Sequence, residues 1–373
     1  MTKPATNILL VIDSLNVGGA QTQLILLANE LSKRNCYVDI FTYHDKNHMA
    51  NRLDGENIQL LTRPRTGKSG VDTILKLRAT INSKSYGAIV AYMYSPNLLA
   101  GLARALSTTT AHLIISYRSC TQFNKLSRLQ LFSRYLSNRL ADSIVSNSFH
   151  ERNRWQKRFP AHANKWTTIY NGIPDKGQRC IRERTGQLLV VGSVSQNKNG
   201  MLLVKALKQL LSKKNLSNLV VNWIGRKDPG IEEANPSAEA IEIELVNSGL
   251  ESKWNWHGEQ DEVLSFYLQA DVLIHMSWLE GLPNVVCEAQ MTGCPVILSK
   301  VLDHPNMINH GQNGFLFDPN QSERLVECVE QLYKLEDDSY QRMCNASREK
   351  AMELYNIDSF ADSYYDLIQH SAP

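Results

Sequence analysis

The segment DVLIHMSWLEGLPNVVCEAQMTGCPVIL, residues 271–298, contains the features that decide the predicted fold. Apolar runs at residues 272–274 and 295–298 predict two buried strands. Between them, Pro283 has the backbone angle suited to a first helical position and Gly293 is typical of a helix end, so we predict a short helix from about Pro283 to Thr292. Strand, loop, helix and strand in this order form one βαβ unit of a parallel sheet.

The same alternation extends along the whole chain. Further apolar runs lie at residues 8–12, 38–41, 58–61, 88–91, 113–115 and 143–145, and then at 188–192, 219–221 and 314–317. Helical patterns separate them, as at residues 23–31, 202–211 and 263–270, and helices are expected from about Arg324 onward. We therefore predict an α/β protein of two doubly wound Rossmann-like domains facing a central cleft. Its predicted parts are residues 1–174, residues 175–355 and a C-terminal helix, 356–373, that packs back on the first domain.

The composition narrows the class of protein. The chain has 373 residues, of which 43% are hydrophobic and 21% charged, with a formal net charge of +3. That balance excludes a disordered or fibrous chain, and no apolar stretch approaches the roughly 20 residues of a membrane-spanning helix. Seven scattered cysteines without a C-x-x-C pair argue against a disulfide framework or a zinc site. We expect a cytoplasmic protein.

The loop before the predicted helix 283–292 is a candidate ligand site. It follows a strand, and ligands of doubly wound sheets bind at the carboxyl ends of the strands. The free N–H groups at the start of the helix favour an anion such as phosphate. Glu280 and Glu288 flank this position, and carboxylates accept hydrogen bonds from sugar hydroxyls. Phosphate and sugar together predict a nucleotide-sugar site.

A dinucleotide cofactor is not expected. The loop at residues 17–20 after the first strand, VGGA, does not satisfy the G-x-G-x-x-G fingerprint. No cofactor is predicted; the nucleotide sugar is a co-substrate, and a UDP-sugar is favoured.

The segment around Glu280 and Glu288 also resembles a known sequence motif. Seven residues separate them, and Ala289 and Gly293-Cys-Pro-Val-Ile297 follow, so the segment resembles the E-x7-E motif of retaining glycosyltransferases of family 4, which have the GT-B fold. Supporting matches run along the chain: Gly18-Gly19-Ala20-Gln21, Asn171-Gly172-Ile173, Val191-Gly192 through Lys198-Asn199, and Asn313-Gly314-Phe315-Leu316. Their order and loop context make the resemblance specific, although two glutamates at this spacing alone are common.

The resemblance implies roles for individual residues. Glu280 would contact the donor sugar, Glu288 the ribose hydroxyls, and Lys198 the donor phosphates and the departing nucleoside diphosphate. Family glycines correspond to Gly18 and Gly19, which would let the first loop approach the reacting end of the donor. The predicted catalytic residues are Glu280, Lys198 and Arg118; the predicted donor-binding residues are Gly18, Gly19, Gly192, Ser193, Ser277, Gly281, Leu282, Pro283, Asn284 and Glu288. A lysine and a helix N-terminus can stabilise the leaving group, so no metal is expected.

Two positions depart from the family pattern. Many relatives have an arginine where this chain has Ser193, which removes one diphosphate contact that Arg226 could replace. Many relatives also have a histidine near Arg118, and arginine cannot perform the proton chemistry of histidine. Arg118 would instead bind a phosphate of the donor or of a lipid diphosphate acceptor; the alternative is a surface arginine without a role.

The region from Arg104 to Lys165 is strongly basic, although the whole chain is nearly neutral. Within it, Phe123, Leu126, Leu129, Phe132, Leu136 and Leu140 recur at helical spacing. Basic residues decorate the same predicted helix, and we predict a membrane-facing set of Lys125, Arg128, Arg134 and Arg139. The alternative is that the apolar stripe packs on the sheet and the arginines are solvated. No nucleic-acid-binding module is recognised.

Taken together, the sequence predicts a retaining, metal-independent hexosyltransferase that uses a nucleotide sugar. The expected acceptor is polyprenol-diphosphate-linked or another glycan, in surface polysaccharide biosynthesis, and the expected location is the inner face of the plasma membrane, as a peripheral protein. The alternatives are a GT-B-type nucleotide-sugar 2-epimerase and a non-catalytic sugar-nucleotide-binding subunit.

Overall fold

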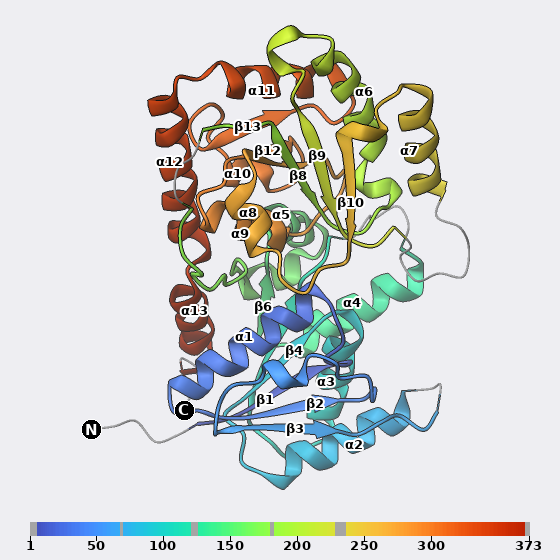
Figure 1. Ribbon diagram of the computed structural model, residues 1–373. Helices are drawn as coiled ribbons and strands as arrows, with labels where there is room; N and C mark the ends of the chain where they lie inside the picture. Colours follow the sequence, from blue (N-terminus) through green and yellow to red (C-terminus); the bar gives the residue numbers. More distant parts are fainter. Residues whose placement is uncertain (1–5, 68–69, 121–125, 180–182, 228–235, 370–373) are drawn as a thin grey trace. The chain divides into compact units, whose positions relative to one another are not determined.

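The computed structural model of the chain describes residues 6–67, 70–120, 126–179, 183–227 and 236–369 (Figure 1). The chain divides into two compact units. The first contains Met1–Gly172 together with Ile357–Pro373, and the second contains Ile173–Asn356. Each unit is an α/β structure built on its own parallel sheet, which confirms the predicted fold class.

The first unit contains a seven-stranded parallel sheet of order β3-β2-β1-β4-β5-β6-β7. Its strands are β1 (Asn7–Ile12), β2 (Tyr37–Thr42), β3 (Ile58–Thr62), β4 (Ala88–Tyr92), β5 (His112–Tyr117), β6 (Ser143–Ser146) and β7 (Trp166–Thr168). The short strand β7 is absent from the sequence-based prediction.

Helices cover both faces of this sheet (Figure 1). They are α1 (Gly19–Lys33), α2 (Val71–Ser83), α3 (Tyr94–Ala105), α4 (Arg128–Leu140), α5 (Phe149–Arg158) and α13 (Ile357–Gln369), with short 3-10 helices at Ala50–Arg52 and Pro160–Lys165. The central strands are apolar at consecutive positions because both faces are buried. In β1, Leu10 and Ile12 contribute to one apolar core, and Leu9 and Val11 to the other.

The C-terminal helix α13 belongs to the first unit. Phe360 and Tyr364 of this helix lie in the same apolar core as α1. At the surface, Arg34 at the end of α1 donates a hydrogen bond of 2.8 Å to Asp362.

The second unit contains a six-stranded parallel sheet of order β10-β9-β8-β11-β12-β13. Its strands are β8 (Gln187–Val191), β9 (Val220–Ile224), β10 (Trp254–Gly258), β11 (Val272–His275), β12 (Val296–Ser299) and β13 (Gly314–Phe317). The edge strand β10 is also absent from the sequence-based prediction.

The helices of the second unit again flank the sheet (Figure 1). They are α6 (Gly200–Leu211), α7 (Pro236–Asn247), α8 (Leu264–Gln269), α9 (Asn284–Met291), α10 (His304–Met307), α11 (Ser322–Lys334) and α12 (Asp337–Tyr355), with 3-10 helices at Gln196–Lys198, Lys214–Leu216 and Glu251–Lys253.

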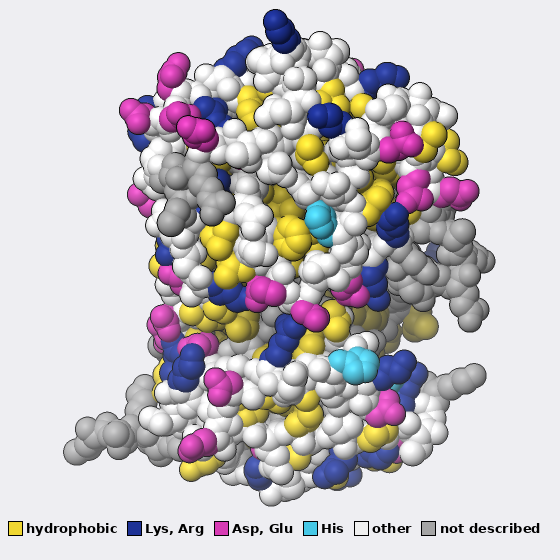
Figure 2. Space-filling model, in the orientation of Figure 1, with side chains coloured by type: hydrophobic (Ala, Val, Ile, Leu, Met, Phe, Trp, Pro, Cys, Tyr) yellow, Lys and Arg dark blue, Asp and Glu magenta, His cyan; other side chains and the backbone are white. Residues whose placement is uncertain are grey.

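Both sheets reverse their strand order once, between β1 and β4 in the first unit and between β8 and β11 in the second. Loops on the two sides of such a switch point separate and leave room for a ligand. The chain therefore places the loops after β1, β4, β8 and β11 where a doubly wound fold binds its ligands. On the face drawn in Figure 2, basic and acidic side chains lie interspersed over both units.

Candidate functional site

The loop at residues 276–283 joins β11 to α9, as the sequence predicts. Pro283 is the residue just before α9 rather than its first helical residue, and the helix ends one residue earlier than expected, at Met291. Gly293 has a φ of +82°, a left-handed conformation that favours glycine and ends the helix. The amide groups at the start of α9 thus follow directly on the loop that carries Glu280.

A second loop, after β8, is locked to this one by Asn197. Its side-chain oxygen accepts a hydrogen bond from the N–H of Leu279 at 3.0 Å, and its side-chain amide donates to the Leu279 carbonyl at 2.8 Å. The backbone carbonyl of Asn197 also accepts from the N–H of Trp278. Asn197 was missed by the sequence analysis, because no spacing pattern connects residues about 80 positions apart.

Lys198 and Glu280 form an ion pair at the junction of these loops. The ammonium group of Lys198 lies 2.6 Å from Oε1 of Glu280, and both side chains are about one-fifth exposed. Burial opposes ionisation of Glu280, but His275 and Lys198 outweigh it and hold the pKa of this carboxyl well below its usual range. The structure therefore brings two of the three predicted catalytic residues into direct contact.

Glu288 lies inside α9 and is partly buried. The hydroxyl of Tyr267, in α8, donates a hydrogen bond of 3.0 Å to Oε2 of Glu288. Burial raises the pKa of Glu288, and the hydrogen bond from Tyr267 only partly offsets this effect. Oε2 is thus fixed by a neighbouring helix, an orientation that suits a carboxylate that recognises hydroxyl groups.

Gly192, at the end of β8, lies against Lys198. Its φ is +139°, and a Cβ at this position would lie 3.1 Å from Cε of the lysine. The Gly192 carbonyl accepts a hydrogen bond of 2.8 Å from the indole of Trp223. Only glycine combines this backbone angle with so close an approach of the lysine. Glycine here therefore keeps the space that Lys198 occupies.

Ser193 and Arg226, the two positions considered for a diphosphate contact, lie in different surroundings. Ser193 is partly buried, and its backbone lies within the turn that joins β8 to the Asn197 loop. Arg226, considered as a substitute for the missing arginine, lies 3.4 Å from Glu259, and both side chains are about half exposed. Arg226 is thus engaged with a surface carboxylate.

A layer of buried polar residues lies behind the loop. Ser277 is fully buried, and its carbonyl accepts a hydrogen bond of 2.7 Å from Ser299. The rings of His275 and His304 lie edge to face with centroids 5.7 Å apart. Neither histidine was predicted, because His275 stands in an apolar run where a histidine is usually a core residue, and His304 belongs to no recognised spacing pattern.

The remaining predicted residues lie in the first unit. Gly18 and Gly19 follow the loop after β1, and Gly18 is the residue just before α1. A Cβ on Gly18 would lie 2.3 Å from the side-chain oxygen of Gln21. The side chain of Gln21 thus packs against Gly18 at the start of α1, at the carboxyl edge of the first sheet.

Arg118 follows β5 and is only 8% exposed, so it is not a surface arginine. Its guanidinium donates hydrogen bonds to Oδ1 of Asn171 at 2.5 Å and to the hydroxyl of Tyr364 at 3.4 Å. It also lies over the rings of Tyr92 and Phe360. No carboxylate of the described residues forms an ion pair with it, and its Nε has no hydrogen-bond partner there. A buried cation held only by neutral groups favours an anionic ligand.

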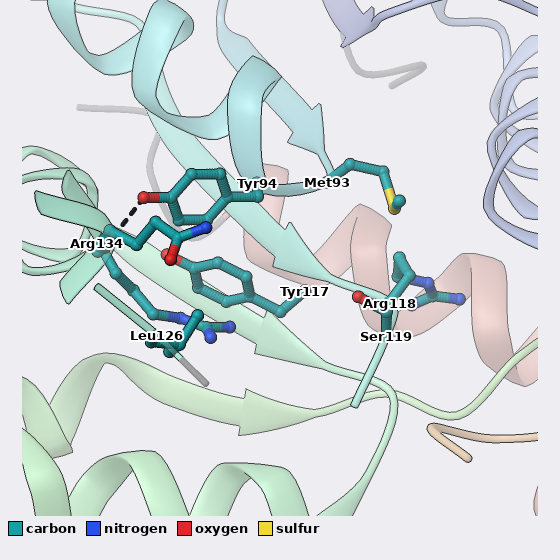
Figure 3. A pocket seen from close by; sticks show the side chains of 8 residues that line it. Met93, Tyr94, Tyr117, Arg118, Ser119, Leu126 and Arg134 are labelled. Atoms are coloured by element: carbon teal, nitrogen blue, oxygen red, sulfur yellow. Dashed lines mark hydrogen bonds between the residues drawn. The ribbon is translucent and has the colours of Figure 1, made fainter. Parts of the chain in front are cut away.

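A pocket of about 210 Å³ opens beside Arg118 at the carboxyl ends of β4 and β5. Figure 3 shows the rings of Tyr94 and Tyr117 close together at one end and the side chains of Met93 and Arg118 at the other. Met93 has a φ of +81°, which is rare for a bulky residue and is typical of functional loops. Leu126, Gln130 and Arg134 complete the wall on the side of α4.

Helix α4 only partly matches the predicted membrane-facing helix. It begins after Ser127 with a capping box to Gln130, so the expected Lys125 precedes it and lies outside the described residues. Arg128 and Arg139 are exposed, and so are the apolar side chains of Leu129 (73%) and Phe132 (61%).

Arg134 contradicts the prediction of an exposed basic face. It is 3% exposed, and its guanidinium lies between the rings of Tyr117 and Trp155, 3.9 Å and 3.6 Å from their centroids. Helical spacing could not place Arg134 correctly, because stacking on two aromatic rings stabilises a buried guanidinium.

Among the described residues, no cluster of three or more His, Cys, Asp or Glu side chains could hold a metal ion. No described helix is both long and apolar enough to span a bilayer.

Comparisons with known proteins cover both units. Residues 17–176 match the family described as "Glycosyltransferase Family 4", and residues 175–350 match the family described as "Glycosyl transferases group 1". An uncharacterized glycosyltransferase of Haemophilus influenzae is 23% identical over 359 residues, which are 95% of this chain and 97% of the relative. A D-inositol 3-phosphate glycosyltransferase of Corynebacterium diphtheriae is 24% identical over 87% of this chain and 83% of its own.

A solved structure with a similar fold is Anabaena Alr3699/HepE in complex with UDP. Its TM-score is 0.82 at 17% identity, and the match covers 98% of this chain and 100% of the other. The two parallel sheets, the E-x7-E loop at the carboxyl end of β11 and the two family matches agree with one another. The chain belongs to glycosyltransferase family 4, whose members are retaining, and it has the GT-B fold.

Proposed function

We propose that the protein transfers a hexose from a UDP-sugar to a lipid-linked glycan acceptor, with retention and without a metal ion, in surface polysaccharide assembly at the membrane surface. The observation that carries the proposal is the contact of 2.6 Å between Lys198 and Glu280 in the loops that precede α9. UDP is favoured because the solved structure with a similar fold binds UDP.

The donor would be held by residues of the second unit. The N-terminus of α9, with the backbone of Gly281–Asn284, would face the diphosphate, because free N–H groups and the helix dipole favour negative charge. Glu288 would accept hydrogen bonds from the ribose hydroxyls, and Glu280 from the transferred sugar. Lys198 would neutralise the charge that develops on the diphosphate as it leaves.

The chemical step needs no nucleophile from the protein. The bond between the anomeric carbon and the diphosphate oxygen breaks, and the acceptor oxygen bonds to the same face of that carbon. The proton of the acceptor hydroxyl passes to an oxygen of the departing diphosphate. The product thus retains the anomeric configuration, and the residues named above stabilise charge and hold geometry.

The acceptor is assigned to the first unit. Arg118 is a buried cation without a carboxylate partner among the described residues, and an acceptor phosphate would satisfy it. The pocket beside it offers apolar and aromatic walls to the rest of the acceptor. Leu129 and Phe132, exposed next to Arg128, would contact an anionic bilayer that carries a lipid-linked acceptor.

A turnover experiment separates this function from its alternatives. The protein is incubated with UDP-glucose and with UDP-N-acetylglucosamine, and the products are followed by NMR. Release or transfer of the sugar in the α-configuration supports the proposal, whereas inversion at C2 identifies an epimerase. Stabilisation by UDP in a thermal-shift assay without any turnover identifies a non-catalytic binding subunit.

A further inference from the structure

His275, the last residue of β11, lies beside Glu280 in the interior of the second unit. Its side chain is 2% exposed, and its Nε2 lies 3.6 Å from Oε1 of Glu280. That separation is slightly longer than a hydrogen bond, and Nε2 has no other partner among the described residues. The same Oε1 accepts the hydrogen bond of Lys198. Two potential hydrogen-bond donors thus face the same carboxylate oxygen, and the lysine is the one that is hydrogen-bonded to it.

Other groups packed around His275 are neutral or already hydrogen-bonded. His304, in α10, donates from Nδ1 to the Ser299 carbonyl at 2.6 Å, and burial lowers the pKa of His304 to about 4. His304 is therefore a neutral neighbour at pH 7. The adjacent strand β12 presents Leu298 opposite His275, and α9 carries Glu288, which is bonded to Tyr267. Among the described residues, Lys198 and Glu280 are the charged groups that act on His275.

These neighbours act on His275 in opposite directions. Burial lowers the pKa of His275 most, Lys198 lowers it further, and Glu280 raises it. Removal of the lysine charge would eliminate one lowering effect and leave the carboxylate without its cation. A partly buried carboxylate without a counter-charge has a high free energy. The pKa of His275 would therefore rise, and its protonated ring would donate a hydrogen bond to Glu280.

We infer that His275 is a positioning residue that holds Glu280 when Lys198 turns from this carboxylate to the diphosphate of the donor. The role of Lys198 rests on the proposed function, whereas the exchange of partners at Glu280 rests on the distances. In this exchange Lys198 leaves Oε1, the imidazole binds one proton from the solvent, and its Nε2–H closes on Oε1. Glu280 stays ionised and in place while its cation is used elsewhere.

The exchange can be tested without any ligand. Lys198→Gln removes the lysine charge, and the imidazole signal of His275 is followed by NMR from pH 5 to 9, with His275→Gln used for assignment. We expect the midpoint of His275 to rise by about one pH unit or more in Lys198→Gln. It should fall again in Lys198→Gln/Glu280→Gln. Lys208→Gln, which removes an exposed lysine of α6, is the matched control and should leave the midpoint unchanged.

An unchanged midpoint in a folded Lys198→Gln variant would overturn the inference. A second readout covers the case in which this variant does not fold. In otherwise wild-type protein, His275→Gln keeps a hydrogen-bond donor and His275→Leu does not. We expect His275→Leu to lower kcat about 10-fold or more at unchanged KM for the UDP-sugar, with a smaller loss in His275→Gln. Equal kcat in both variants would contradict a positioning role.

The two proposals fail separately. If the wild-type protein turns over no UDP-sugar but the Lys198→Gln midpoint still rises, the proposed function fails and the coupling at Glu280 stands. If turnover is found and the midpoint does not move, only the inference about His275 fails.

Discussion

The ammonium group of Lys198 is hydrogen-bonded to Oε1 of Glu280 at 2.6 Å, although the two residues lie in different loops about 80 positions apart. Asn197 fixes this arrangement, because it pairs with both the N–H and the carbonyl of Leu279. The ammonium group that would neutralise the leaving group in the proposed function is therefore held by a carboxylate of the same loops.

Lys198→Ala should lower turnover by at least ~10²-fold, because it removes one preorganised electrostatic donor from the leaving group. Lys208→Ala, the exposed control on α6, should retain full turnover. Activity should persist in excess EDTA, since the proposed site stabilises the diphosphate with a lysine and a helix N-terminus. Loss of transfer in EDTA with recovery in Mg²⁺ or Mn²⁺ would show that this account of the leaving group is wrong.

Replacement of the two motif glutamates should give different kinetic changes. Glu288→Ala should weaken UDP binding, and Glu280→Ala should lower kcat more than binding, each by about 1.5–3 kcal/mol for a lost charge-assisted hydrogen bond. Tyr267→Phe removes the hydrogen bond that fixes Glu288 and should weaken UDP binding by a smaller factor. Calorimetry with UDP and steady-state kinetics measure these effects. Near-normal transfer by both alanine variants would show that Glu280 and Glu288 do not form the donor site.

Helix α4 should bind anionic vesicles through its exposed residues. Leu129→Ser/Phe132→Ser and Arg128→Gln/Arg139→Gln should each reduce sedimentation with phosphatidylglycerol vesicles, the second pair only at low salt, because 1 M salt shortens screening to ~3 Å. Leu75→Ser changes an exposed leucine (54%) on another helix of the same unit, α2, and is the control. Vesicle binding that survives both double substitutions would leave α4 with a purely structural role.

Arg134 should act on stability and not on vesicle binding. Arg134→Gln removes a guanidinium that is stacked between two aromatic rings, so the free energy of unfolding should fall by about 2 kcal/mol. Urea denaturation measures this loss. If Arg134→Gln instead weakens vesicle binding at unchanged stability, Arg134 must reach the surface.

The buried His304 should make the second unit less stable in acid. Burial lowers the pKa of His304 to about 4, whereas the unfolded chain has a value near 6.5. Because the folded value is depressed, the stabilising contribution is complete above pH 6.5 and is lost as the pH falls toward 4. His304→Asn, which keeps a donor for the Ser299 carbonyl, should unfold with a weaker pH dependence between pH 6.5 and 4. An equal slope in both proteins would contradict a buried neutral His304.

Much of the fold could be predicted because both sheets are parallel and buried on both faces. Their central strands then consist of unbroken apolar runs, as at β1 and β11, which stand out in any sequence. The two missed strands lie at sheet edges and lack such runs. β10 alternates tryptophan with polar residues, and β7 has only three residues, so neither has the pattern of a buried strand.

The sequence by itself determined the motif residues, the helix that follows Glu280 and contains Glu288, and the family, because these depend on local spacing along the chain. The tertiary structure alone decided which side chains meet. It brought Asn197 and Lys198 into contact with the loop that carries Glu280 and placed His275 beside Glu280. It also buried Arg134 between Tyr117 and Trp155. The loops of the second unit meet because β8 and β11 are neighbours in the sheet, and Arg134 is buried because α4 packs on the first sheet. No periodicity in the sequence encodes such long-range neighbours.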